Sequence, residues 1–517
     1  MVHIRLDGST LTIEDLFKAA TQPSRISLAE SSKKSMRRSR ALVEEWLAKK
    51  ERIYGVTTGF GEFSNVQIPL EKIEELQRNL IFSHAAGTGE PLPAEVVRAM
   101  MILRVNALAK GFSGIRIGTV ECITKFFNSG LVPVIPSQGS VGSSGDLVQL
   151  AHLVLTLMGK GKVISDWRSA FENSKTIASG IAMKKRGLSP LSLSAKEGLA
   201  LINGTQMMTA YAALISYQSR QLCALADIAA AMSVEALKGS DTPFDERIHR
   251  LRPFKGQLDS ARNLRALLSR SEIRESHRHS DHRVQDAYSL RCAPQVHGAS
   301  RDALEYVANA VSIEINSAND NPLIFPKDKE HLEGGNFHGQ PIALAMDFAA
   351  IALSELANIS ERRIERMVNG SLSGLPRFLT SDGGVNSGLM IAQYTAASLV
   401  SENKVLAHPA SVDSIPTSAN QEDHNSMGSI SAQKCWRILR NAQTVIAIEL
   451  MTSAQGIDFH APLKCAKGTN AAYTAIRSRI PHLDRDRVLY DDIQKALGLL
   501  LDGKILHSVE KVVGKLG

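Results

Sequence analysis

The chain has 517 residues, of which 44% are hydrophobic and 22% charged, a balance typical of a globular protein with a sizeable core. Its five cysteines are odd in number and no two stand at metal-ligand spacing, which argues against a disulfide framework and predicts reduced thiols in a cytoplasmic protein. The formal net charge of +8 is compatible with an anionic substrate, but the densest basic run, residues 33–40, contains no aromatic residue and is interpreted as a solvated helix face rather than a nucleic-acid site.

The N-terminal part of the chain is expected to be ordered from its start. It has no basic segment followed by an apolar one, so no signal peptide is predicted. Thr12 stands three residues before Asp15, a spacing that predicts a capped helix start. Residues 57–145 are rich in Gly and Pro, which is typical of segments that carry binding sites. The apolar run 147–158 is too short to span a bilayer, so no membrane partner is expected.

Long helices are predicted for most of the remaining chain. Residues 195–236 contain no Pro and are dense in Ala, Leu, Met and Ile, and apolar residues recur at helical spacing in residues 341–367 and 429–456. We therefore expect a mainly α protein with two regions. Residues 1–195 would form a smaller N-terminal region that carries the active site, and residues 196–517 would form a long-helix bundle with C-terminal helices.

The segment Gly139-Ser-Val-Gly-Ser-Ser-Gly-Asp-Leu147 carries the most specific chemistry. It can be interpreted as a capped turn before a helix; a phosphate loop is less consistent, because no Lys follows the last Gly. A tight turn also permits the amide nitrogen of Gly145 to attack the carbonyl carbon of Ser143. Ring closure and the loss of two waters, one of which takes the Ser144 hydroxyl, would leave a 4-methylidene-imidazol-5-one (MIO), an electrophile that no ordinary side chain provides.

Ten further motifs accompany this triplet. They are residues 54–61, 77–80, 83–85, 87–89, 203–206, 285–292, 319–322, 334–338, 401–404 and 418–424. In this order and spacing the motifs resemble the histidine and aromatic amino-acid ammonia-lyase family over nearly the whole chain. The resemblance implies a homotetramer with a central helical core, active sites formed by several subunits, and an MIO made autocatalytically from Ser143, Ser144 and Gly145 with no external cofactor.

The resemblance also implies roles for individual residues. Tyr54 would be the base that meets the β-proton of the substrate, and its pKa would have to be depressed by nearby cations or helix N-termini. Arg291 would bind the substrate carboxylate through its planar fork of donors. The polar residues around the carboxylate and the ring would be Asn203, Gln285 and Tyr288, with Tyr288 and Ser144 counted with Tyr54 as catalytic, and Phe337 would pack against the ring.

The substrate is expected to be L-histidine, converted to trans-urocanate and ammonia. His84 and Glu422 match the positions at which histidine-specific members keep a His and a carboxylate. These two groups can pair with the nitrogen atoms of an imidazole, whereas a phenyl ring would leave each unpaired at a cost of ~1–3 kcal/mol. The chain departs from the family pattern in having Ser143 in place of Ala, an extra hydroxyl expected to change hydrogen bonding around the ring. Two other departures are Thr57, where many such members carry Asn, and Val148-Gln149 in place of Ala-Pro.

Other interpretations stay open. A tyrosine or phenylalanine lyase, or an aminomutase, is the alternative within enzymes. A catalytically silent scaffold or anionic-ligand binder is the alternative outside them. His277, His279, Asp281 and His282 form a His-rich tract, but their spacing fits no closed zinc site, and we interpret them as a solvated loop near the Gln285 motif and expect no metal.

Overall fold

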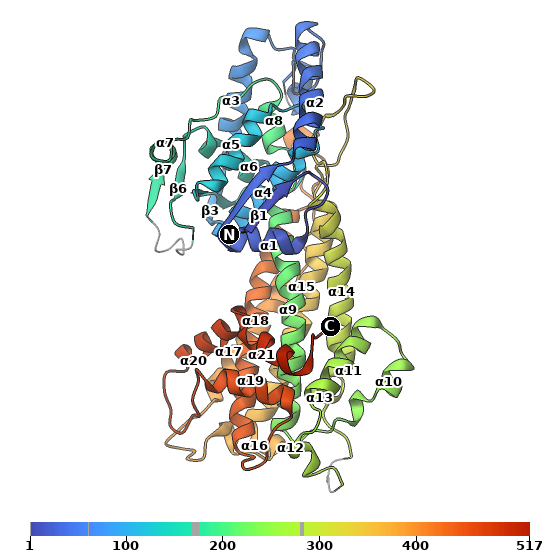
Figure 1. The fold of residues 1–517 in the computed structure, drawn as a ribbon, viewed down its shortest axis with the longest axis vertical. Helices are drawn as coiled ribbons and strands as arrows, with labels where there is room; N and C mark the ends of the chain where they lie inside the picture. The colour runs from blue at the N-terminus through green and yellow to red at the C-terminus, as the bar shows by residue number, and fades with distance from the viewer. Residues whose placement is uncertain (1, 60, 168–174, 280–283) are drawn as a thin grey trace. The chain divides into compact units, whose positions relative to one another are not determined.

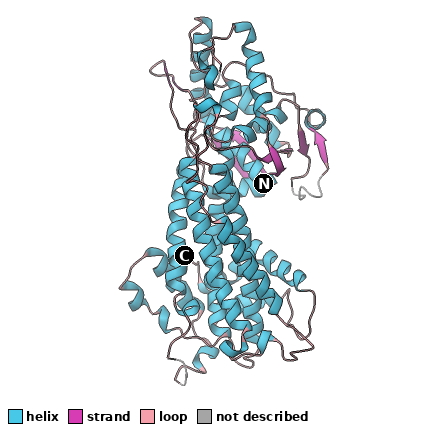
Figure 2. Ribbon diagram, turned by 180° about the vertical axis from the view of Figure 1, so that it is seen from behind, coloured by secondary structure: helices cyan, strands magenta, loops and turns pink. Residues whose placement is uncertain are grey.

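The structure is a computed structural model that describes residues 2–59, 61–167, 175–279 and 284–517. The chain folds as two compact units, each built from three stretches. Unit 1 comprises residues 1–217, 308–347 and 409–433, and unit 2 comprises residues 218–307, 348–408 and 434–517. Helices make up most of the described chain and the strands are few and short, which confirms the predicted mainly α fold (Figure 2). The predicted division at residue 195 stays a prediction.

Of the five points at which the chain passes from one unit to the other, one lies between residues 408 and 409, and the other four lie in four long helices. They are α9 (Gln206–Ala236), α14 (Ala293–Glu314), α15 (Gln340–Val368) and α18 (Gly428–Asp458). The predicted helices at 341–367 and 429–456 correspond to α15 and α18. By length and composition α15 is apolar enough to cross a membrane, but 72% of its most apolar window is buried inside the protein, as in the core helix of a globular protein.

The helix predicted from residue 195 to 236 is interrupted. A short helix, α8 (Glu197–Ile202), ends at Asn203, and α9 begins only at Gln206. Gly204 between them has a φ of +150° and forms an isolated β-bridge with Gly145. The helical pattern continues across the break in sequence, but this long-range pairing takes the backbone out of the helix.

Unit 1 is built around a helix that is buried on every side, α4 (Ala94–Ala109). Its Arg98 side chain donates to the carbonyl oxygens of Ala19 and Ala20, both at 2.8 Å, which satisfies a charge that would otherwise be costly to bury. The other helices of unit 1 pack around α4 or its neighbours (Figure 1). They are α1 (Ile13–Thr21), α2 (Glu30–Ala48), α3 (Ile73–His84), α5 (Ile117–Asn128), α6 (Leu147–Leu157), α7 (Ser179–Lys185) and α8.

The strands of unit 1 form four small sheets. In the parallel pair β1–β2, Val2 lies opposite Ser24 and Leu6 opposite Leu28. The pairs β3–β5 and β8–β9 and the three-stranded sheet β4–β6–β7 are antiparallel. The strands are β1 (Val2–Leu6), β2 (Ser24–Leu28), β3 (Thr88–Pro91), β4 (Val132–Pro133), β5 (Pro136–Gln138), β6 (Lys162–Ile164), β7 (Thr176–Ala178), β8 (Leu323–Phe325) and β9 (Glu330–Leu332).

Two local predictions in unit 1 are decided by the structure. The side chain of Thr12 accepts a hydrogen bond from Asp15 N and caps α1, as predicted. The basic run lies on α2, where Lys34, Arg37 and Arg38 are exposed as expected. The predicted solvation is wrong for Arg40, which is buried and donates to the carbonyl oxygen of Ala195 at 3.0 Å.

Unit 2 is a bundle in which the four long helices run side by side (Figures 1 and 2). Its core contains polar links as well as apolar packing: Glu449 of α18 accepts from Arg363 of α15 at 2.5 Å and from Ser233 of α9 at 2.7 Å, all three buried. The remaining helices are α10 (Glu246–Arg250), α11 (Lys255–Leu267), α12 (Glu272–Glu275), α13 (Tyr288–Arg291), α16 (Gly370–Ser373), α17 (Met390–Leu406), α19 (Lys467–Arg477), α20 (Leu489–Leu501) and α21 (Lys504–Val513). The described residues include all five cysteines and hold no disulfide.

Candidate functional site

The Ser143-Ser144-Gly145 turn lies in unit 1, just before α6. Gly142 and Gly145 have φ values of +73° and +75°, which glycine adopts without strain. Gly145 packs directly on the backbone of Gly204: a Cβ atom on Gly145 would lie 2.0 Å from the Gly204 carbonyl oxygen. No residue larger than glycine fits at position 145 unless the backbone moves.

Asp146 ties the same turn to the start of α9. Its Oδ2 accepts hydrogen bonds from the amides of Met207 at 2.8 Å and Met208 at 3.0 Å, in the first turn of that helix, where free N–H groups favour an anion. Burial nevertheless raises the pKa of Asp146 to about 7, and the two amide hydrogen bonds oppose this rise. The side chain makes no cap bond to its own helix α6.

Hydrogen bonds from α4 stabilise the break between α8 and α9. Buried Arg104 donates to the carbonyl oxygen of Asn203 at 2.8 Å and to Gln206 Oε1 at 2.7 Å, and it also bonds the carbonyl of Ala200. Asn203 is buried, and its side-chain oxygen has no hydrogen-bond partner among the described residues. This amide oxygen is therefore free to bind a polar group.

Glu422 is the carboxylate that contacts the triplet. Its Oε2 accepts from the hydroxyls of Ser143 at 3.0 Å and Thr417 at 2.8 Å, and its Oε1 accepts from the hydroxyl of Ser144 at 2.9 Å. Backbone pairing of Thr417 with Glu422 closes the short loop that carries this side chain. The Ser143 hydroxyl, which is extra relative to the family pattern, thus has Glu422 as its partner, and its effect on hydrogen bonding around a ring stays a prediction.

Tyr54 and His84 both lie within electrostatic range of Glu422. The Tyr54 hydroxyl accepts from Gly61 N at 3.3 Å, and its pKa is raised, first by burial and then by the Glu422 carboxylate. Within unit 1 burial outweighs the Gly61 hydrogen bond, which would lower this pKa, and the depressed pKa expected for Tyr54 in a complete active site stays a prediction. Burial lowers the pKa of His84 and Glu422 opposes this, while His84 Nδ1 lies 3.0 Å from Ser83 Oγ.

Phe337 lies half-buried in the segment between β9 and α15. Two neighbours connect this segment to the loops already described. His338 Nε2 lies 3.1 Å from the carbonyl oxygen of His424, and Gly339 N donates to Gly142 O at 3.4 Å. The segment is therefore fixed against the start of the triplet turn and the end of the Glu422 loop.

Gln285, Tyr288 and Arg291 belong to unit 2. Tyr288 begins α13 with 70% of its surface exposed, and the guanidinium carbon of Arg291 lies 4.5 Å from its ring centroid. Gln285 is also exposed. Buried Arg291 Nε has no hydrogen-bond partner among the described residues, so this guanidinium keeps a donor for another group.

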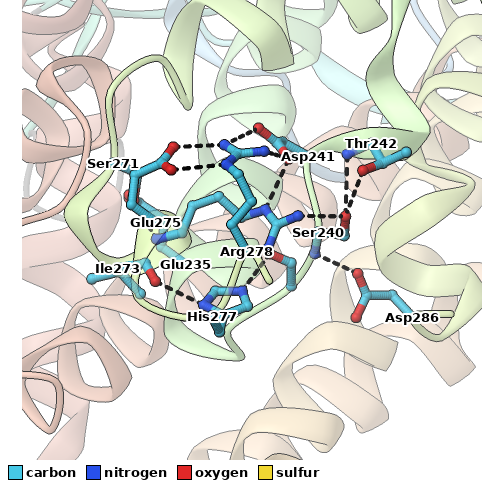
Figure 3. Close-up of polar contacts among 12 residues, drawn as sticks. Glu235, Ser240, Asp241, Thr242, Ser271, Ile273, Glu275, His277, Arg278 and Asp286 are labelled. Carbon is cyan, nitrogen blue, oxygen red and sulfur yellow. Dashed lines mark hydrogen bonds and ion pairs between the residues drawn. The ribbon is translucent and has the colours of Figure 1, made fainter. Parts of the chain in front are cut away.

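A network of charged residues anchors the segment that leads to α13 (Figure 3). Asp241 accepts from Arg274 Nε at 2.8 Å and from Arg278 Nη2 at 3.0 Å. Asp286, next to Gln285, accepts from Ser240 N at 2.6 Å. This network has no signal in the sequence, because the partners of Asp241 and Asp286 lie more than 30 residues away along the chain.

The His-rich tract shows no sign of a metal site where it is described. His277 Nδ1 lies 2.7 Å from the carbonyl oxygen of Ile273, and its Nε2 lies 3.3 Å from that of Gly239, so both nitrogens face backbone (Figure 3). Asp281 and His282 lie outside the described residues. No group of three or more His, Cys, Asp or Glu side chains that could hold a metal occurs in the described ranges.

Unit 1 holds Tyr54, His84, Asn203, Phe337, Glu422 and the triplet, and the triplet turn is paired with Gly204 at the α8–α9 break. Unit 2 holds Gln285, Tyr288 and Arg291. Thr417 is the neighbouring residue that sequence reasoning missed. Thr417 stands one residue before the 418–424 motif, and no spacing in the sequence indicates that its hydroxyl contacts Glu422.

Comparison with known proteins gives a consistent result over the full chain. The profile described as aromatic amino acid lyase matches residues 11–478. A histidine ammonia-lyase of Alkaliphilus oremlandii is 52% identical over 99% of both chains, and one of Caldanaerobacter subterraneus is 52% identical over 98% of both.

Solved structures agree. A histidine ammonia-lyase from Trypanosoma cruzi is 45% identical, with a TM-score of 0.91 over 99% of this chain and 96% of that one. A tyrosine aminomutase from Streptomyces globisporus is 38% identical, with a TM-score of 0.93 over 99% of both chains. The motifs, the helical fold and these full-length similarities together show that the chain belongs to the aromatic amino acid lyase family.

Proposed function

We propose that this protein removes ammonia from L-histidine to give trans-urocanate, using an MIO formed from its own Ser143, Ser144 and Gly145. The observation that supports histidine as the substrate is the position of Glu422, whose carboxylate accepts hydrogen bonds from Ser143 and Ser144 of the triplet. A carboxylate there can accept a hydrogen bond from an imidazole N–H. The relatives that are about half identical over the full chain carry the name of this activity.

Two features of unit 1 fit formation of the ring. Gly145 is pressed against Gly204 at a position where a Cβ atom would be 2.0 Å from the opposite carbonyl oxygen, which favours the tight turn that closure needs. Asn203, one residue before Gly204, presents a buried amide oxygen that no described residue bonds. The chemistry that the ring supplies, once formed, is electrophilic activation of the substrate amine as a leaving group.

The protein's side chains would handle the rest of the reaction. A proton leaves the β-carbon, the amine leaves the α-carbon, and the electron pair of the broken C–H bond becomes the new double bond. Tyr54 would take the proton as its phenolate. Because burial and Glu422 raise its pKa within unit 1, we infer that groups from outside unit 1 lower it in the assembled active site.

Separate groups of residues would bind the carboxylate and the side chain of the substrate. Arg291 would bind the carboxylate as a planar fork, with Gln285, Tyr288 and Asn203 around it. Glu422 and His84 would bind the imidazole, and Phe337 would pack against the ring. A phenyl side chain would leave Glu422 and His84 without partners, at ~1–3 kcal/mol each.

We also propose that the protein is a cytoplasmic homotetramer whose active sites are shared between subunits. Large apolar side chains of unit 2 remain about half-exposed on α14, α15 and α17: Tyr306, Phe348, Ile351, Ile391 and Tyr394. Exposed apolar surface of this kind on long helices is typical of an interface with other copies. We propose no metal and no nucleic-acid partner.

The test is to incubate purified protein separately with L-histidine, L-tyrosine and L-phenylalanine and to follow the ultraviolet absorbance of urocanate, coumarate and cinnamate. Urocanate is the expected product. Ser144→Ala, which removes the hydroxyl that ring formation must expel, is the matched control and should give none.

The alternative outcomes are distinct. Turnover of tyrosine or phenylalanine in place of histidine would contradict the proposed substrate. It would favour the alternative of a tyrosine or phenylalanine lyase or an aminomutase, and the tyrosine aminomutase structure is of this kind. No turnover of any amino acid, with residues 143–145 at their unmodified mass, would contradict the enzyme and favour a silent scaffold.

A further inference from the structure

The two oxygens of Glu422 have different partners. Oε2 is held by two hydroxyls, those of Ser143 at 3.0 Å and Thr417 at 2.8 Å. Oε1 is held by one, that of Ser144 at 2.9 Å. The Thr417 hydroxyl is in turn approached by the side-chain amide of Asn425 at 3.5 Å, and Thr417 is paired through its backbone to Glu422. The carboxylate is thus oriented by donors from the triplet and from its own loop.

The proposed ring formation changes these partners unequally. The hydroxyl of Ser144 is lost as water, so the bond to Oε1 disappears. Ser143 contributes only its main-chain carbonyl to the ring and keeps its side chain. The bond from Ser143 to Oε2 therefore has no chemical reason to disappear, and Thr417 takes no part in the reaction.

We propose that Ser143, with Thr417, is a positioning residue that fixes Oε2 of Glu422 and so presents Oε1, freed by loss of the Ser144 hydroxyl, to the imidazole of the substrate. This inference rests on the proposed function. It gives Ser143, which stands where the family pattern has alanine, a role in binding rather than in ring closure. Formation of the ring then also completes the side-chain pocket, because the same loss of water removes the hydrogen-bond donor from Glu422 Oε1, the oxygen that binds the substrate.

The geometry supports this role over a purely structural one. Ser143 is buried, and its hydroxyl is directed to a carboxylate 279 residues away in sequence. A hydrogen bond to a charged group is stronger than one to a neutral group, and two donors on one oxygen restrict rotation of the carboxylate. Removal of either hydroxyl donor would let the Glu422 carboxylate rotate, so Oε1 would face the substrate for a smaller fraction of the time.

Binding without turnover provides the first test. The Ser144→Ala variant lacks the hydroxyl and cannot form the methylidene, so L-histidine binding can be measured by calorimetry. We expect Ser144→Ala to bind L-histidine and the added change Ser143→Ala to weaken that binding about tenfold, as for loss of one hydrogen bond to a charged group. Ser143→Thr, which keeps the hydroxyl, should restore affinity. Ser179→Ala is the matched control, since Ser179 donates a buried bond of 2.7 Å to Thr156 O and does not contact Glu422.

Steady-state kinetics provide the second test. Ser143→Ala alone should show full conversion of residues 143–145 by peptide mass, a KM for L-histidine about tenfold higher, and a kcat within about twofold of the parent. Equal affinity with and without the Ser143 hydroxyl, no binding by Ser144→Ala, or failure of Ser143→Ala to convert would each overturn the proposal. A parent enzyme that is fully converted yet does not turn over histidine would instead contradict the proposed function.

Discussion

Replacing Gly204 with alanine should destabilise unit 1 strongly, because this glycine joins the helix break to the triplet. Its φ of +150° is strained for any residue with a Cβ, at ~1–3 kcal/mol. The new Cβ would lie 2.6 Å from Arg104 Nη1, 2.6 Å from Gln206 Oε1 and 2.8 Å from Asn319 Oδ1. These groups are bonded to one another and buried, so at least one hydrogen bond to the guanidinium must break, at ~1.5–3 kcal/mol.

The two contributions together predict a loss of about 2.5–6 kcal/mol in the free energy of unfolding of unit 1. Gly130→Ala is the matched control: its φ is +80°, but nothing among the described residues lies within 4 Å of the added Cβ, so only the backbone strain applies. The assay is urea unfolding followed by fluorescence, with peptide mapping of residues 143–145. If Gly204→Ala unfolds at the same urea concentration as Gly130→Ala and still converts its triplet, the proposed support of the turn by Gly204 is refuted.

Three other predictions address the chemistry and its pH dependence. Tyr54→Phe should fold normally and lower kcat for L-histidine by about 10²- to 10⁴-fold, measured as urocanate formation, because the proton acceptor is gone; a smaller loss would assign the base elsewhere. Arg291→Lys should raise KM about tenfold with a smaller effect on kcat, since an ammonium cannot form the bidentate fork; an unchanged KM would exclude a carboxylate contact. Asp146 has a pKa of about 7 in the fold against an ordinary value of 3.8, so near neutral pH the folded state holds a proton that the unfolded chain has released. The stabilising contribution of Asp146 is therefore complete below about pH 4 and is lost as the pH rises to about 7. The variant Asp146→Asn should flatten this part of the curve of unfolding free energy against pH. An unchanged slope would contradict the raised pKa.

The sequence by itself determined the fold class and the family. Helices such as α15 and α18 follow from apolar periodicity, and the cap at Thr12 follows from a spacing of three residues. These features are local: each depends on residues within a few turns of one another, so their energetics can be read from neighbouring letters. The motifs around Tyr54 and the triplet identified the family for the same reason, since each is a short contiguous run.

Only the tertiary structure decided what those residues contact. The helical pattern at residues 195–236 gave no sign of the break at Gly204, which exists because Gly145 pairs with it. Arg40 in a basic run is buried rather than solvated because Ala195 offers it a carbonyl acceptor. The link from Ser143 to Glu422 joins positions 279 residues apart, and the raised pKa of Tyr54 depends on burial by the whole unit. Hydrogen bonding and desolvation act through space, so they are fixed only when packing brings distant segments together.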